Sequence, residues 1–264
     1  MGLAIIGGGV MGEALLSRLL ERHVYTPDLV WVSDPQESRR AFLTTQYGVH
    51  VTAENQVAVD AAGVVLLAIK PQMFKAAVST LAMPTSEVLI VSILAGTSLQ
   101  ALETAFPAQP IVRAMPNTPA TVGAGMTAIA AGSLAQSHHL QVARQLFEAV
   151  GEVVEVAETL MDAVTGLSGS GPAYVALMIE ALSDGGVAAG LPRAIATQLA
   201  LQTVRGTAEL LQTTGMHPAE LKDRVTSPGG TTIAGVAQLE QAGFRSALIA
   251  AVKAAYLRAQ ELGR

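Results

Sequence analysis

The chain begins with Leu3-Ala4-Ile5-Ile6-Gly7-Gly8-Gly9-Val10-Met11-Gly12, an apolar strand that runs directly into glycines. The spacing Gly7-x-Gly9-x-x-Gly12 suits a dinucleotide pyrophosphate, because the first glycine permits a tight turn, the second lets the backbone approach the phosphates, and the third lets the next helix pack closely on the strand. That helix would direct its free N–H groups and the positive end of its dipole at the anion. A glycine turn without a ligand is the alternative. The strand before it and the apolar-periodic helix after it favour a dinucleotide site.

Composition limits the other classes of function. Half of the 264 residues are hydrophobic and 14% are charged, which is enough apolar material for one large or two ordinary domains. Ala, Val and Leu carry the apolar excess, so we expect a subunit interface between closely packed helices. The net charge of −5 and the lack of any basic run argue against nucleic acid and membranes as partners. The chain has no Cys, which excludes disulfides, thiolate metal sites and cysteine nucleophiles. We find no signal peptide and no apolar run of the roughly 20 residues that a membrane helix needs, and we therefore expect a cytoplasmic protein.

The first part of the chain alternates strands and helices. The nearly continuous Val, Ile and Leu content of the strands is typical of a parallel sheet that is buried on both faces. Expected strands are 3–6, 30–33, 64–69, 88–93, 111–115, 125–131 and 153–156. Expected helices are 11–22, 36–46, 74–81 and 99–105, and we expect Ser133 to cap a further helix that runs to Val150.

After residue 160 the pattern predicts helices only. Gly or Pro separates each of them from the next, as expected of helix ends. Expected helices are 161–167, 173–189, 194–213, 219–225, 232–242 and 245–262. The sequence therefore predicts an α/β chain, with an N-terminal Rossmann-type dinucleotide-binding domain over residues 1–158 and an all-helical C-terminal domain over residues 159–264.

Charged residues after the second strand leave the choice of cofactor open. Asp34 stands at about the distance from the glycines at which a ribose-binding acid is expected. A carboxylate there accepts hydrogen bonds from both ribose hydroxyls and repels a 2′-phosphate, which favours NADH. Arg39 and Arg40 follow at the start of the next helix and could instead clamp the 2′-phosphate of NADPH, unless they lie on a solvated helix face.

Three further strand ends, at residues 68–71, 93–96 and 114–119, should border the cofactor, because ligands of such folds bind beyond the carboxyl ends of the strands. Lys70 closes an otherwise apolar strand and either contacts cofactor or substrate or simply reaches water. The loop 116–119 has Pro at both ends, which predicts a rigid loop whose Asn117 and Thr118 face a ligand, or merely a tight turn.

A second small-residue segment, Thr226-Ser227-Pro228-Gly229-Gly230-Thr231-Thr232, opens a helix near the C-terminus. Its hydroxyls and the helix N–H groups together make a compact site for a small carboxylate. A plain helical corner with Thr caps is the alternative.

Other ionisable residues are weaker candidates. His138 and His139 are adjacent, so we expect them on different helix faces and a poor metal pair. Glu180 lies in an apolar helix with Asp184 one turn later. As a buried acid it could protonate a substrate, but an interface ion pair or a solvent-facing side chain is the simpler interpretation.

The motifs of the chain, taken together, resemble pyrroline-5-carboxylate reductase over essentially the whole length. They are the glycine-rich start, Ala68-Ile69-Lys70-Pro71, Arg113-Ala114-Met115-Pro116-Asn117-Thr118-Pro119, Ser168-Gly169-Ser170-Gly171-Pro172-Ala173-Tyr174 and Ser227-Pro228-Gly229-Gly230-Thr231-Thr232. The resemblance implies that NAD(P)H reduces the cyclic imine of 1-pyrroline-5-carboxylate to L-proline, the last step of proline synthesis. It also implies that the helical domains bind substrate and interlock into homodimers, which can assemble into larger rings.

The resemblance also implies the residues of the site. Ser227, Gly230, Thr231 and Thr232 would hold the substrate, and we expect the hydroxyl of Thr232 to hydrogen-bond the imine nitrogen as the catalytic group. The cofactor would be lined by Ile6, Gly7, Gly8, Gly9, Val10, Met11, Asp34, Asn55, Ala68, Ile69, Lys70, Pro71, Ile93, Leu94 and Ala95. Two positions depart from the family pattern. Asp34 stands where members often have Ser or Asn, and Gly215 stands where some have a carboxylate on the substrate side.

Two rival functions remain at this point. One is a reductase of another small imine or acid on the same plan, although the helical domain contains only Lys222 and Lys253 as candidates for the lysine base of hydroxyacid dehydrogenases. The other is a dinucleotide-binding sensor without catalysis, against which the intact loop 227–232 argues.

Overall fold

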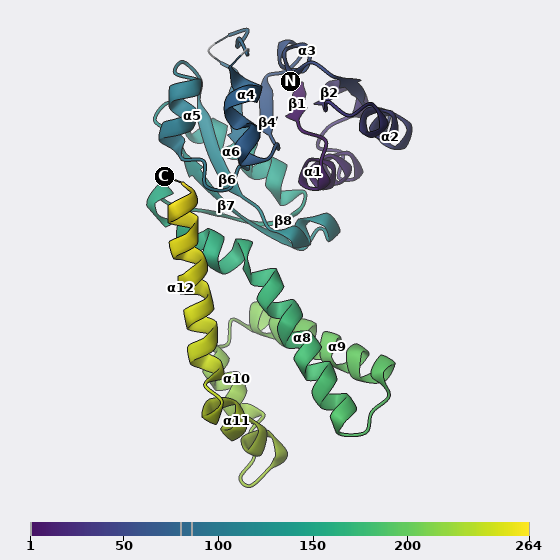
Figure 1. Ribbon diagram of the computed structural model, residues 1–264, viewed down its shortest axis with the longest axis vertical. Coiled ribbons are helices and arrows are strands. Elements are labelled where there is room, and N and C mark those ends of the chain that lie inside the picture. Colours follow the sequence, from purple (N-terminus) through teal and green to yellow (C-terminus); the bar gives the residue numbers. More distant parts are fainter. Residues whose placement is uncertain (1, 80, 86, 264) are drawn as a thin grey trace. The chain divides into compact units, whose positions relative to one another are not determined.

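The apolar strands of the first part pair into one eight-stranded sheet in the described residues of the computed structural model, 2–79, 81–85 and 87–263 (Figure 1). The strand order is β3-β2-β1-β4-β5-β6-β7-β8, and every neighbouring pair is parallel except β6 with β7. Ile5 lies between Val32 and Leu66, which sets the central register. The strands are β1 (Leu3–Ile6), β2 (Val30–Ser33), β3 (His50–Thr52), β4 (Val64–Leu67), β5 (Leu89–Ser92), β6 (Ile111–Met115), β7 (Gly125–Ala131) and β8 (Gly151–Glu155).

Helices cover both faces of this sheet, because alternate residues of each buried strand point to opposite sides. Leu3 and Ile5 pack in one core with α1 (Val10–Glu21), α2 (Glu37–Tyr47) and α6 (Ser137–Glu148). Ala4 and Ile6 pack in the other with α3 (Asn55–Asp60), α4 (Phe74–Val78) and α5 (Leu99–Ala105). The chain reverses its strand order between β1 and β4, and this reversal opens a crevice at the carboxyl ends of the strands.

The predicted strands are all present, and only the ends of β4, β5 and β8 are shifted, but the sequence reading missed β3. This strand has only three residues, His50–Thr52, and lies at the edge of the sheet, so it carries no apolar run. The predicted cap at Ser133 is wrong. Helix α6 begins at Ser137, and Gln136 and His139 form a capping box in which His139 Nδ1 accepts a hydrogen bond from the Gln136 N–H at 3.0 Å.

The described residues divide into two units, one of residues 2–170 with 254–263 and one of residues 171–253. The first unit contains the sheet, α7 (Met161–Val164), a π-helical turn (Thr165–Gly169) and short 3₁₀ turns at Pro27–Leu29, Pro71–Met73, Thr118–Val122 and Glu158–Leu160. The π turn replaces the end of the helix expected over residues 161–167. The domain boundary at residue 158 stays a prediction. None of the helices in the described residues is both long and apolar enough to span a lipid bilayer.

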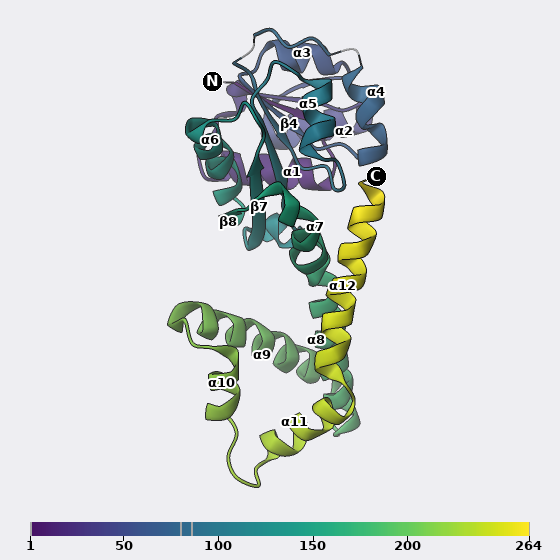
Figure 2. The ribbon, with the colours of Figure 1, turned by 90° about the vertical axis from the view of Figure 1, so that its left-hand side faces the viewer.

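The second unit is helical throughout. It contains α8 (Gly171–Ala188), α9 (Arg193–Thr214), α10 (Pro218–Arg224), α11 (Thr231–Gln241) and the first part of α12 (Phe244–Leu262), and Figure 2 shows the open loop between α10 and α11. Ser183 is buried on α8, where Arg193 donates to its hydroxyl at 3.0 Å. Large apolar side chains such as Leu177, Leu201 and Ile249 remain more than half exposed, at 66%, 55% and 65%. Such a surface is typical of an interface with another subunit.

A buried arginine stabilises the first unit. Arg113 on β6 lies 3.1 Å from Glu158, whose carboxylate also accepts a hydrogen bond from the Leu99 N–H, and 3.9 Å from Asp162. Arg113→Met should lower the free energy of unfolding by about 1–3 kcal/mol, since Glu158 loses its charged partner but stays one-third exposed. Urea denaturation measures the loss. Arg258→Met, which breaks an exposed pair with Glu261, should cost less than about 1 kcal/mol, and equal losses would contradict the assignment.

Candidate functional site

The three glycines of the first motif have different physical roles. Gly7 has φ +103°, and a Cβ there would lie 2.8 Å from the carbonyl oxygen of Ala68. A Cβ on Gly12 would overlap the carbonyl oxygen of Gly7 itself. A Cβ on Gly9, by contrast, would meet no atom within 4 Å. Gly7 and Gly12 are therefore required by the fold, whereas Gly9 leaves space open above the N-terminus of α1.

A cavity of about 510 Å³ lies where the strand order reverses, at the carboxyl ends of β1, β2 and β4. This is the place where ligands bind in doubly wound sheets. Seven of the expected cofactor residues line it: Gly7, Gly9, Asp34, Asn55, Ala68, Ile69 and Lys70. Its glycine cradle and its carboxylate fit the pyrophosphate and ribose of a nicotinamide dinucleotide.

The other expected cofactor residues do not line this cavity. Ile6 and Leu94 are buried in the core, and Val10 is exposed on the first turn of α1. The remaining ones that lie outside the lining are Gly8, Met11, Pro71, Ile93 and Ala95. The sequence reading missed seven lining residues, Ser33, Pro35, Gln36, Ala53, Met73, Ala76 and Ala77. The first four flank strand ends and could have been found from that position, but nothing in the sequence marks the three that come from the α4 region.

The carboxylate of Asp34 connects the glycine loop to the turn after β2. One oxygen, Oδ2, accepts a hydrogen bond from the Gly8 N–H at 3.1 Å, and Oδ1 accepts one from the Gln36 N–H at 2.9 Å. Behind it, the Ser33 hydroxyl donates to Asn55 Oδ1 at 2.6 Å, and Asn55 Nδ2 donates to the Ala77 carbonyl at 3.4 Å. These bonds hold the cavity walls from β2, α3 and α4 in fixed positions.

Both arginines after β2 are engaged with protein groups. Arg39 forms an ion pair with Glu13 of α1 and donates to the Gly8 carbonyl. Tyr47 donates to the same Glu13 carboxylate at 2.8 Å. Burial alone would raise the pKa of Glu13, but the hydrogen bonds from Arg39 and Tyr47 lower the pKa of its carboxyl on balance. Burial and the bond to Glu13 raise the pKa of Tyr47 to about 12.

Arg40 is held by backbone carbonyls. Its Nη1 donates to the carbonyls of Asp34 at 2.8 Å and Pro35 at 2.9 Å. Neither Arg39 nor Arg40 lines the cavity.

The loop before α11 lies in the second unit. The Gly230 N–H donates to the Ser227 carbonyl at 3.1 Å, and Gly229 takes the left-handed conformation at φ +66°. Gly230 is the N-cap of α11, and no side chain caps this helix, so the N–H groups of its first turn are left without a side-chain acceptor. The hydroxyls of Ser227 and Thr231 are on exposed residues, and Thr232 is half-buried. Such a set of donors can bind a small carboxylate.

Comparison with known proteins decides the family. A pyrroline-5-carboxylate reductase from Synechocystis sp. is 61% identical over 262 residues, which are 99% of this chain and 98% of that protein. This chain belongs to the pyrroline-5-carboxylate reductase family. Residues 158–262 match the family described as pyrroline-5-carboxylate reductase dimerisation, and residues 2–96 match the NADP oxidoreductase, coenzyme F420-dependent family.

Solved structures of pyrroline-5-carboxylate reductases agree with the fold. The enzyme from Coxiella burnetii is 34% identical with a TM-score of 0.92, over 100% of this chain and 98% of that one. The Plasmodium falciparum enzyme, whose structure has NADP bound, is 29% identical with a TM-score of 0.90 and the same coverage. The predicted resemblance and the predicted fold class, a Rossmann-type domain followed by a helical dimerisation domain, are confirmed. The chain is an oxidoreductase.

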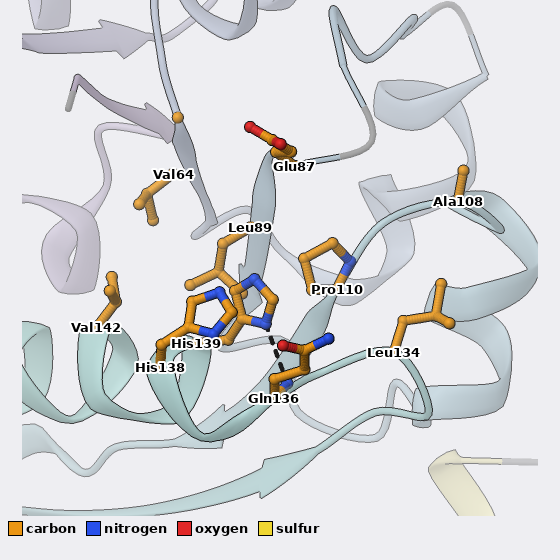
Figure 3. A pocket seen from close by; sticks show the side chains of 11 residues that line it. Val64, Glu87, Leu89, Ala108, Pro110, Leu134, Gln136, His138, His139 and Val142 are labelled. Atoms are coloured by element: carbon orange, nitrogen blue, oxygen red, sulfur yellow. Dashed lines mark hydrogen bonds between the residues drawn. The ribbon is translucent and has the colours of Figure 1, made fainter.

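A second cavity, of about 550 Å³, lies at the N-terminal ends of the strands, away from the cavity lined by Gly9 and Asp34 (Figure 3). Val64 and Leu89 at the starts of β4 and β5 line it, together with His138 and His139. The ring centroids of the two histidines are 3.7 Å apart, so the expectation that they face different sides of the helix is wrong. Burial and the neighbouring His138 lower the pKa of His139. Among the described residues no group of three or more His, Cys, Asp or Glu could hold a metal ion.

Two further candidates do not gain support from the structure. Asn117 uses its amide within the first unit, donating to the Ser168 carbonyl at 3.2 Å and accepting from the Met126 N–H at 2.8 Å, which favours the interpretation as a tight turn. Glu180 is exposed, so burial provides no reason for it to act as an acid, while Asp184 pairs with Arg193 at 2.6 Å.

Proposed function

We propose that this chain reduces 1-pyrroline-5-carboxylate to L-proline with a hydride from NAD(P)H. The observation that carries the proposal is the loop of Gly7, Gly9 and Gly12, the glycine cradle. Of these three glycines, only Gly9 leaves open space above the N-terminus of α1. Membership of the reductase family supplies the substrate class. An NADP-bound relative of the same fold supports the nicotinamide cofactor.

The proposed site has a cofactor half and a substrate half. In the cofactor half, the N–H groups at the start of α1 would bind the pyrophosphate, and the carboxylate of Asp34 would accept hydrogen bonds from the ribose hydroxyls. Lys70 lines the same cavity, and its ammonium would reach a phosphate or the substrate carboxylate. The resemblance also assigns to this half the residues outside the cavity lining, namely Ile6, Gly8, Val10, Met11, Pro71, Ile93, Leu94 and Ala95.

In the substrate half, Ser227 and the N–H groups of Gly230 and Thr231 would bind the carboxylate of the cyclic imine. A nicotinamide held in the cavity at β1, β2 and β4 would supply the hydride that reduces the C=N bond of the protonated imine to the C–N bond of a secondary amine. The hydroxyl of Thr232 would accept a hydrogen bond from the imine N–H and hold the ring in the reactive orientation. Catalysis would then rest mainly on orientation.

We also propose how the protein assembles and where in the cell it is located. The exposed apolar surface of the helical unit and the match to the dimerisation family support a homodimer formed through this unit. A larger ring of dimers and a cytoplasmic location complete the proposal. Sedimentation of the purified protein and fractionation of cells that express it test these two points.

Oxidation of NADH and of NADPH in the presence of pyrroline-5-carboxylate tests the proposed function. We expect turnover and accumulation of L-proline. Binding of a dinucleotide without turnover of this substrate would favour a sensor or a reductase of another imine or acid. Assays with cyclic imines of other ring sizes then distinguish those two alternatives.

A further inference from the structure

We propose that Asp34 selects the cofactor of this enzyme and that it selects NADH over NADPH. The inference rests on the proposed function only in that the cavity at β1, β2 and β4 binds a nicotinamide dinucleotide. The sequence leaves the choice between NADH and NADPH open, because Asp34 favours the first and Arg39 and Arg40 could favour the second.

Asp34 is placed to recognise two free ribose hydroxyls. Its carboxylate lines the cavity, and each oxygen already accepts one backbone hydrogen bond, from Gly8 and from Gln36. A carboxylate has about four acceptor positions, so each oxygen keeps one for a ligand donor. The Gly8 bond also fixes the carboxylate against the glycine loop, which is the segment that would hold the pyrophosphate.

A 2′-phosphate removes one of those donors and brings a like charge. Such a group carries roughly −1.5 to −2 at neutral pH and offers acceptor oxygens, to which Asp34 has nothing to donate. Like charges in contact at a binding site disfavour the wrong partner strongly.

The arginines do not compensate in this arrangement. Arg39 is paired with Glu13, bonded to the Gly8 carbonyl and stacked over Phe42 with its guanidinium carbon 5.0 Å from the ring centroid. Tyr47 holds Glu13 from the other side. Arg40 donates to two carbonyls and lies outside the cavity lining. A 2′-phosphate would have to break these contacts before either arginine could bind it.

Calorimetric titration of the full chain with NAD⁺ and NADP⁺ tests the inference without any catalytic step. We expect NAD⁺ to bind at least about tenfold more tightly. Asp34→Ser should lower this ratio at least about tenfold, mainly by improving NADP⁺ binding. Asp34→Asn keeps the shape and one acceptor oxygen, and it should also lower the ratio. Because both carboxylate oxygens accept backbone N–H bonds, the amide loses one of these bonds, so the melting temperature is measured beside the ratio.

Glu37→Ser is the matched control, because Glu37 is exposed on the first turn of α2, lies outside the cavity lining and carries the same charge. The ratio of NAD⁺ affinity to NADP⁺ affinity of this variant should equal that of the parent chain. Salt gives an independent check. If Asp34 repels the 2′-phosphate, salt screens this repulsion, and the preference for NAD⁺ over NADP⁺ falls as ionic strength rises. If an arginine instead attracts the phosphate, salt screens that attraction and weakens NADP⁺ binding, so the preference for NAD⁺ rises.

Equal or tighter binding of NADP⁺ by the parent chain would overturn the inference and show that Arg39 or Arg40 leaves its partners. Binding of neither nucleotide would overturn it together with the cofactor half of the proposed function. Selective NAD⁺ binding without reduction of pyrroline-5-carboxylate would leave the inference standing and remove only the substrate assignment.

Discussion

Gly9→Ala is expected to weaken dinucleotide binding at least about tenfold while the melting temperature stays within experimental error of the parent, since one methyl group forced against a ligand costs about 1–3 kcal/mol. The methyl group would meet no protein atom within 4 Å, and the backbone at φ −68° and ψ −172° is one that Ala adopts freely. The pyrophosphate of the bound dinucleotide is then the only group that the new methyl group would obstruct.

Gly12→Ala provides the contrast. Its methyl group would overlap the Gly7 carbonyl oxygen, a backbone atom that cannot rotate away. We expect a loss of about 1–3 kcal/mol in the free energy of unfolding, together with weaker binding. Thermal unfolding and calorimetric titration of both variants measure the two effects separately. If Gly9→Ala binds NAD⁺ and NADP⁺ as the parent does, the pyrophosphate does not pass over Gly9, and the assignment of the loop is wrong.

The same pair of glycines shows what the sequence could and could not predict. Spacing alone located the loop, because the tight turn and the close approach leave no choice of residue type. Only the three-dimensional structure separates Gly12, which the fold requires, from Gly9, which leaves room for a ligand. The apolar strands were predictable for a similar reason, since burial on both faces demands Val, Ile and Leu, whereas β3 was missed because three residues at a sheet edge have no such demand.

Side-chain partnerships were beyond prediction. Arg39 and Arg40 follow Asp34 in sequence and could have faced a phosphate, but their direction depends on Glu13, Tyr47 and two carbonyls that lie elsewhere in the fold. The cap of α6 was misplaced for the same reason. A Ser is a common cap, but here Gln136 and His139 satisfy each other across one turn. Local chemistry therefore predicts where a site lies better than it predicts which groups remain free to act there.

Thr232→Ala is expected to lower kcat/KM for pyrroline-5-carboxylate by about 10- to 100-fold, which corresponds to the loss of one hydrogen bond of about 1.5–3 kcal/mol to a charged group. Gly230 is the N-cap of α11 and no side chain caps that helix, so the substitution removes no cap and the melting temperature should not change. Affinity for the nicotinamide cofactor should also stay unchanged, since the cavity lined by Gly9 and Asp34 belongs to the other unit of the fold.

Steady-state kinetics at saturating cofactor measure the effect, and calorimetry of cofactor binding supplies the second readout. Thr232→Ser keeps the hydroxyl and should restore most of the rate, which a merely steric role of the methyl group would not predict. Thr104→Ala is the matched control, because Thr104 is exposed and its hydroxyl donates to the Gln100 carbonyl within its own helix. Unchanged kinetics in Thr232→Ala would remove Thr232 from the reaction. The imine nitrogen would then be held by another donor or acceptor of the loop 226–231, and single substitutions of Ser227 and Thr231 would identify it.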